Sequence, residues 1–278
     1  MAETRVIDTG TEACLARVED GVAVVTLNRP ERKNALSQPM LEGLANALAE
    51  CEAARDVRAV VLTGAGKGFC AGGDVKSMAE SGNLSLGGPP ATFDEAVHRQ
   101  RLSQRATVAR IYRMPKPVIA SLPGAAAGAG LGLAMACDLR VAADNAVMIT
   151  AFARVGFSGD FGLPWFLPQI VGRSKALELF YSSDRLTAQD CLALGLVNWV
   201  VSEAELVQRT MEIARRLAVG PAVSFRYIKE NINKAYTQDL EDFMDGEVMR
   251  HLTAGRTEDH REAVKAFVEK REPSFKGR

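Results

Sequence analysis

The sequence predicts an α/β fold with parallel strands, followed by a C-terminal region made only of helices. Through about residue 201, short apolar runs typical of strands alternate with segments whose apolar residues recur at helical spacing. Beyond that point the strand pattern stops, and helical spacing continues over residues 203–219, 221–235, 239–253 and 257–269. We therefore expect a core of residues 1–201 and a helical appendage of residues 202–278.

The core elements are expected in this order: two strands over 13–28, a helix over 38–56, a strand over 57–64, a short helix from Val75, a loop over 81–92, a long helix over 93–114, a strand over 117–124, a helix within 128–138 and a strand over 139–144. Residues 19–21, Glu-Asp-Gly, give the first two strands a hairpin turn. Pro115 ends the long helix, because proline disfavours helical backbone in the residue before it.

Composition argues against several classes of function. The 278 residues carry 34 Lys and Arg against 34 Asp and Glu, without the basic excess typical of proteins that bind nucleic acid or anionic membranes. No apolar run approaches the roughly 20 residues of a membrane span, and the polar start MAETRVIDTG is unlike a signal peptide. The five cysteines form no CxxC pair, and the three histidines lack metal-ligand spacing. We expect a cytoplasmic protein with reduced thiols and no metal.

Two glycine-rich segments, GFCAGGDVK (68–76) and GAAAGAGLGLAMACD (124–138), each follow a short apolar run. Nucleotide-binding loops do not fit them. A P-loop requires Ser or Thr after its lysine, whereas Gly68 follows Lys67, and a dinucleotide loop requires glycine at Leu133. Glycine turns at helix starts can direct main-chain N–H groups at a negative charge and form an oxyanion hole. They can equally be tight strand-to-helix turns, and the residues alone leave both interpretations open.

The chain resembles a known family through both glycine segments and three further motifs: TLNRPERKNALS (26–37), SSDRLTAQDCLALGLVNWVV (182–201) and AGRTEDHREAVKAFVEKREPSF (254–275). In this order they are similar to the crotonase superfamily, also called the enoyl-CoA hydratase/isomerase family. The resemblance covers nearly the whole chain. It implies a spiral of ββα units with a helical trimerisation region, assembled as a homotrimer or a dimer of trimers. It also implies a coenzyme A thioester substrate and no separate cofactor.

The resemblance places two oxyanion-hole donors in the glycine segments. They are the N–H of Gly73 and the N–H of Ala129, where relatives usually have glycine. The main-chain donor survives that difference, because the side chain does not donate. We expect both nitrogens to lie within about 3 Å of one oxygen position.

Hydratases of this family use two glutamates to activate water, and this chain has Gly132 and Phe152 at those positions. Neither side chain ionises, so hydration by that route should be badly impaired. Asp160 aligns with an aspartate of dienoyl-CoA isomerases, of phenylacetate-pathway enoyl-CoA isomerases and, as a nucleophile, of 4-chlorobenzoyl-CoA dehalogenases. Without the resemblance, Gly-Asp-Phe-Gly (159–162) would be interpreted as a turn.

The function that the resemblance favours is double-bond isomerisation. Asp160 would move a proton from C2 to C4 of a 3-enoyl thioester, while Phe152 and Phe157 would keep the pocket apolar. The motifs LPWFLPQIVGRSKA (163–176) and AGRTEDHREAVKAF (254–267) are most similar to those of the phenylacetate-pathway isomerase. The alternatives are an enoyl-CoA hydratase-like lyase of fatty-acid metabolism and a CoA-thioester binding protein without catalysis. A dehalogenase is disfavoured because its histidine has no evident counterpart among His98, His251 and His260.

Contacts to coenzyme A are expected from three residues. Lys76 lies where relatives reach the CoA phosphates, and Phe267 and Lys270 match positions that a neighbouring subunit contributes. For the two lysines, a solvated surface charge is an equally open interpretation.

Overall fold

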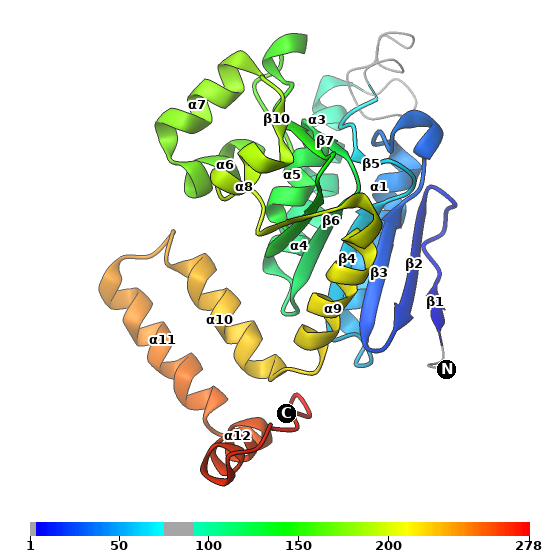
Figure 1. The fold of residues 1–278 in the computed structure, drawn as a ribbon. Coiled ribbons are helices and arrows are strands. Elements are labelled where there is room, and N and C mark those ends of the chain that lie inside the picture. The colour runs from blue at the N-terminus through cyan, green and yellow to red at the C-terminus, as the bar shows by residue number, and fades with distance from the viewer. Residues whose placement is uncertain (1–3, 75–91) are drawn as a thin grey trace.

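A seven-stranded sheet forms the centre of the computed structural model, which describes residues 4–74 and 92–278 (Figure 1). The sheet order is β1-β2-β3-β4-β6-β8-β11, formed by Arg5–Ile7, Cys14–Glu19, Val22–Leu27, Ala59–Gly64, Val118–Leu122, Leu139–Ala143 and Trp199–Val201. β1, β2 and β3 are antiparallel neighbours, and every pairing from β3 to β11 is parallel. The predicted hairpin turns at Asp20 and Gly21, both with positive φ. The predicted α/β fold is confirmed.

A second sheet of very short strands was not predicted. Its order is β10-β9-β7-β5, formed by Leu186–Thr187, Val147–Ile149, Ala125–Ala127 and Gly68–Cys70. Strands of two or three residues are too short to display the alternation that identifies a strand in a sequence. β5 and β7 begin the two glycine segments and pair in parallel, with Gly68 opposite Ala125. This pairing brings the two segments side by side.

Helices enclose the seven-stranded sheet on both faces. The larger core includes residues of α1 (Gln38–Ala53), α4 (Val108–Arg113), α5 (Ala129–Ala136), α6 (Leu163–Val171), α7 (Arg173–Ser182) and α8 (Ala188–Ala193). On the other face, α9 (Leu206–Ala218) packs Leu206, Ile213 and Ala214 against Val61 and Ile119 of the sheet. α9 thus joins the core although it follows residue 201. The division of the chain at 201/202 stays a prediction.

The last three helices extend away from the sheets (Figure 1). They are α10 (Ala222–Lys234), α11 (Leu240–Ala254) and α12 (Glu258–Glu269), close to the predicted ranges. Short 3₁₀ turns at Pro30–Arg32, Ala153–Val155 and Glu203–Glu205 complete the elements. None of the helices in the described ranges combines the length and apolar character needed to cross a membrane.

The prediction of one long helix over residues 93–114 is wrong, because the structure has two helices there. α3 (Phe93–Ala106) ends and α4 begins on either side of Thr107, whose backbone leaves the helical region with φ −111° and ψ −88°. The buried Thr107 hydroxyl donates to the carbonyl oxygen of Ser103 at 2.7 Å, a back-bond that bends helices. The expected short helix from Val75 lies outside the described residues, as does the expected loop up to residue 91.

Candidate active site

A cavity of about 420 Å³ lies where the two glycine segments meet. Its walls come from residues 71–73 after β5, from the start of α5, from α3 and from residues 151–160. The cavity brings together residues that sequence analysis had assigned separately to the site: Gly73, Ala129, Phe152, Phe157 and Asp160. The structure therefore gathers the predicted oxyanion donors, the predicted base and the two predicted apolar residues around one space.

The glycines of both segments permit two backbones to approach closely. At Gly72, where φ is 87°, a Cβ atom would lie 2.7 Å from the oxygen of Ala127 and 3.4 Å from the nitrogen of Ala129. At Gly130, a Cβ atom would lie 2.4 Å from the oxygen of Cys70. Both distances to oxygen are shorter than a side chain tolerates, so the first turn fits against the start of α5 only with glycine.

Ala129 is the first residue of α5, where an N–H group has no acceptor within the helix. The preceding Gly128 adopts φ 51° and donates its own N–H to the oxygen of Ile149 at 3.0 Å. The positive end of the α5 dipole thus lies at the cavity wall. Gly73 lines the same wall, next to the turn at Gly72. The convergence of both N–H groups on a single oxygen position stays a prediction.

The segment 26–37 holds the first glycine turn in place. Buried Asn34 donates from its side chain to the carbonyl oxygens of Ala65 at 2.9 Å and Gly68 at 2.8 Å. The N–H of Leu36 donates to the oxygen of Gly72 at 2.8 Å. Arg32 binds both carboxylate oxygens of Asp74, each at 3.1 Å. This motif therefore acts as a scaffold for the turn that carries Gly73.

Asp160 is held by amide donors on both sides of its carboxylate. Oδ1 accepts from Nε2 of Gln104 at 2.6 Å and from the N–H of Phe161 at 2.9 Å, while Oδ2 accepts from Nε2 of Gln100 at 2.7 Å. Burial raises the pKa of Asp160 above its ordinary value, and the hydrogen bonds from Phe161 and Gln100 oppose that rise. Sequence analysis missed both glutamines. Their spacing of four residues on α3 was visible, but nothing in the sequence indicated a partner.

The two positions that the resemblance assigns to hydratase glutamates are filled by packing. A Cβ atom at Gly132 would lie 2.6 Å from the main-chain oxygen of Phe161, and Phe161 itself has no exposed surface. Phe152 is buried and stacks on Phe180, with ring centroids 6.3 Å apart. Among the described residues that line the cavity, Asp160 is the only carboxylate.

Phe267 and Lys270 do not line this cavity within one chain. Phe267 lies on α12 with 85% of its surface exposed, and Lys270 follows at the end of that helix. α12 lies at the far end of the molecule from α3 and β5 (Figure 1). Lys76 lies outside the described residues.

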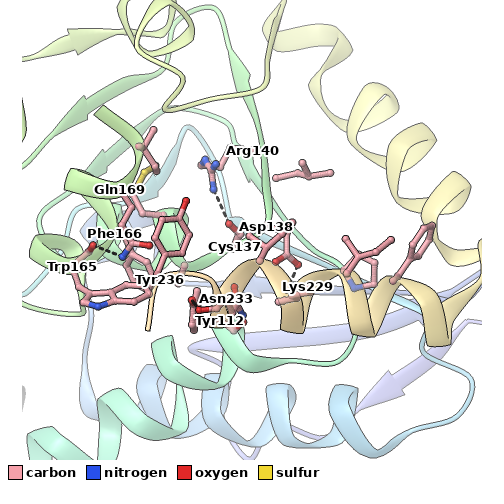
Figure 2. Close-up of a pocket in the computed structure, with 18 of the residues that line it drawn as sticks. Tyr112, Cys137, Asp138, Arg140, Trp165, Phe166, Gln169, Lys229, Asn233 and Tyr236 are labelled. Atoms are coloured by element: carbon pink, nitrogen blue, oxygen red, sulfur yellow. Dashed lines mark hydrogen bonds and ion pairs between the residues drawn. The ribbon is translucent and has the colours of Figure 1, made fainter. Parts of the chain in front are cut away.

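A second cavity of about 380 Å³ separates α10 from the core (Figure 2). Figure 2 shows Lys229 of α10 against Asp138, where its Nζ lies 2.8 Å from Oδ2. Arg140 donates to the carbonyl oxygens of Cys137 and Leu196, both at 2.7 Å. These polar groups satisfy one another, and no predicted site residue lines this space. Across residues 4–74 and 92–278, no three His, Cys, Asp or Glu side chains are grouped closely enough to hold a metal ion.

Comparison with known proteins identifies the family to which this fold and site belong. The family model for enoyl-CoA hydratase/isomerase matches residues 17–278. The chain is 38% identical to the 1,2-epoxyphenylacetyl-CoA isomerase of Escherichia coli K12, over 96% of this chain and 99% of that protein. It is 34% identical to the short-chain-enoyl-CoA hydratase of Clostridium acetobutylicum, over 94% and 96%.

Solved structures agree with the sequence comparison. The crystal structure of an enoyl-CoA hydratase from Polaromonas sp. JS666 matches with a TM-score of 0.87 at 32% identity, covering 95% of this chain and 99% of that one. The chain therefore belongs to the enoyl-CoA hydratase/isomerase family, the crotonase superfamily, whose members act on acyl-CoA thioesters.

Proposed function

We propose that this protein isomerises the double bond of an enoyl-CoA thioester, with Asp160 as the base. The observation that carries the proposal is the cavity itself. Its described residues hold one carboxylate beside two glycine turns, and the positions assigned to the hydratase glutamates are packed. Addition of water requires groups that activate and deliver it, whereas relocation of a proton requires a single base. The relatives are named both isomerases and hydratases, and one of them is an acyl-CoA isomerase at 38% identity.

The proposed reaction begins when Asp160 removes a proton from C2 of a 3-enoyl thioester. Negative charge then gathers on the thioester oxygen, where the N–H groups of Gly73 and Ala129 would stabilise it. One such donor is worth about 2.7–4 kcal/mol of barrier lowering. Return of the proton at C4 completes the shift and leaves the base ionised again. The buried Phe152 and the half-exposed Phe157 line this apolar space and support exclusion of water.

The proposal includes an assembly in which a neighbouring subunit completes the CoA site. Phe267 and Lys270 lie far from the cavity of their own chain, which supports a role at a neighbour's site. The substrate supplies coenzyme A, and no further cofactor is invoked. Five buried free thiols among the described residues support the reducing cytoplasm as the compartment.

Replacement of the base tests the function. Asp160→Asn keeps the shape and removes the base, so isomerisation of 3-enoyl-CoA substrates should fall by about 10²–10⁴-fold. Binding of the same acyl-CoA, measured by calorimetry, should change little. The parent should hydrate crotonyl-CoA slowly or not at all. In the parent, kcat/KM should fall at low pH through a pKa above the ordinary aspartate value, because burial raises the pKa of Asp160.

Two outcomes contradict this function. Efficient hydration of crotonyl-CoA by the parent would favour the hydratase alternative. Absence of turnover across a panel of 3-enoyl-CoA substrates that nevertheless bind would favour a thioester-binding protein without catalysis.

A further inference from the structure

We propose that Gln104 and the Phe161 N–H anchor Oδ1 of Asp160, which leaves Oδ2, held by Gln100, as the oxygen that carries the proton. The inference rests on the proposed function of Asp160 as the base. Gln100 and Gln104 act in it as positioning residues, because they bind the base and not the reacting carbon atoms.

The hydrogen bonds differ between the two carboxylate oxygens. An ionised carboxylate offers about four acceptor sites, two on each oxygen. Oδ1 receives two donors, from Gln104 at 2.6 Å and Phe161 at 2.9 Å. Within the part of the chain that the structure describes, Oδ2 receives one donor, from Gln100 at 2.7 Å. Oδ1 is therefore saturated, and Oδ2 retains an acceptor site for a proton.

The position of the glutamines relative to the cavity agrees with this division. Gln100 lines the cavity together with Asp160, whereas Gln104, one helical turn further along α3, is absent from its wall. The hydrogen bond from Gln104 to Oδ1 therefore lies behind the cavity wall, whereas the hydrogen bond from Gln100 to Oδ2 lies at the wall. α3 itself is fixed at its start by a capping box between Thr92 and Glu95.

Gln100, Gln104 and the Phe161 N–H together form an amide clamp around the Asp160 carboxylate. None of these three donors takes up or releases a proton in the working pH range. Glutamine does not titrate, so the donors remain in place over the whole working pH range. Arg101 on α3 is the other ionisable side chain among the described residues of the cavity wall, and Arg105 follows on the same helix. The described wall residues from the other elements carry no ionisable side chain apart from Asp160 itself, and Arg154 of the segment 151–159 does not line the wall.

The test removes each donor with a side chain of similar length. In Gln104→Met, the ionised form of Asp160 loses the hydrogen bond from Gln104, so the pKa of Asp160 rises. The acid limb of kcat/KM should move to higher pH by the same amount, with KM for the acyl-CoA unchanged because Gln104 is not on the cavity wall. Gln100→Met should raise the pKa and also change KM. Gln208→Met, at an exposed position on α9, is the matched control and should change neither.

A direct titration separates this inference from the proposed function. The ¹³C resonance of the Asp160 carboxyl, assigned by its loss in Asp160→Asn, reports the pKa without turnover. An upward shift in Gln104→Met supports the clamp, and an unchanged titration in the folded variant overturns it. Gln104→Asn keeps the amide but is one methylene shorter, so it should give the same shift and replaces Gln104→Met if that variant does not fold. An Asp160→Asn enzyme as active as the parent would remove the proposed function, while the ¹³C shift would still judge the clamp.

Discussion

Gly132 lies against Phe161, which leaves no space for a larger side chain at residue 132. The resemblance assigns a hydratase glutamate to this position, but the backbone and side chain of Phe161 occupy the space where its Cβ atom would lie. Phe161 is fully buried and adopts φ 47°, a conformation that non-glycine residues seldom adopt. Phe161, the residue after Asp160, therefore fills the space that the resemblance assigns to a hydratase glutamate. A glutamate at residue 132 would have to displace this turn.

At the residue scale we predict that Gly132→Ala lowers the free energy of unfolding by about 1–3 kcal/mol, the typical effect of overpacking. Gly68→Ala is the matched control, because a Cβ atom there meets no other atom within 4 Å. Chemical denaturation followed by circular dichroism measures both. Gly132→Glu should not gain hydration of crotonyl-CoA. A Gly132→Ala protein as stable as the parent would show that Phe161 moves aside easily.

At the scale of elements, one ion pair joins α10 to the core. Lys229 donates to Oδ2 of Asp138 at 2.8 Å and to the oxygen of Ile111 at 3.1 Å, and Asp138 also accepts from the N–H of Val118 at 2.7 Å. Burial raises the pKa of Asp138, and Lys229 lowers it again. Lys229 thus connects α10 to α4 and, through Asp138, to the start of β6. Its ammonium group compensates the charge of the buried Asp138 carboxylate.

We predict that Lys229→Met lowers the free energy of unfolding at pH 7 by about 1.5–3 kcal/mol, the value of a hydrogen bond to a charged group. The loss should be smaller at pH 4. A carboxyl whose pKa is higher in the folded state binds more protons there, so stability falls as pH rises through that pKa. Removal of Lys229 raises the pKa of Asp138 further, so stability then falls over a wider range of pH. Denaturant titrations at both pH values measure the difference, with Lys234→Met, exposed on the same helix, as control. An equal loss at both pH values would contradict the role of Asp138.

At the scale of the whole molecule, the C-terminal helices present apolar surface that their own chain does not cover. Every fourth residue of α11 from Leu240 onward is apolar and at least half exposed: Leu240, Met244, Val248 and Leu252. Phe267 and Val268 on α12 are more exposed still, at 85% and 75%. A continuous apolar stripe of this kind usually marks a protein interface. It supports the proposed trimer or dimer of trimers.

We predict that the parent is a trimer or hexamer by light scattering at micromolar concentration. Met244→Glu, which places a charge in the middle of the α11 stripe, should shift the protein toward smaller species. Asp245→Lys alters the charge at the neighbouring exposed position, outside the stripe, and should leave the assembly intact. A monomeric parent would contradict the proposed assembly and, with it, the proposed roles of Phe267 and Lys270.

The order of the main elements and several of the residues around the cavity were predictable from the amino-acid sequence. The period of apolar residues identified the principal strands and the C-terminal helices, because that period records which side of each element is buried. The glycine segments were recognisable because close backbone approach requires glycine at fixed positions. The resemblance to the family was needed to select Asp160, which lines the same cavity as Gly73 and Ala129.

The contacts between residues far apart in the chain depend on the folded structure. Gln100 and Gln104 lie 60 and 56 residues from Asp160 in the chain, and no local pattern pairs them with it. The short β5–β7 pairing, the filling of the Gly132 position by Phe161 and the break at Thr107 were likewise absent from the sequence analysis. The period of apolar residues shows that a residue is buried, but the residue that it contacts depends on how the sheets and α3 pack together. The candidate site is therefore predictable in its motifs and not in the contacts that orient Asp160.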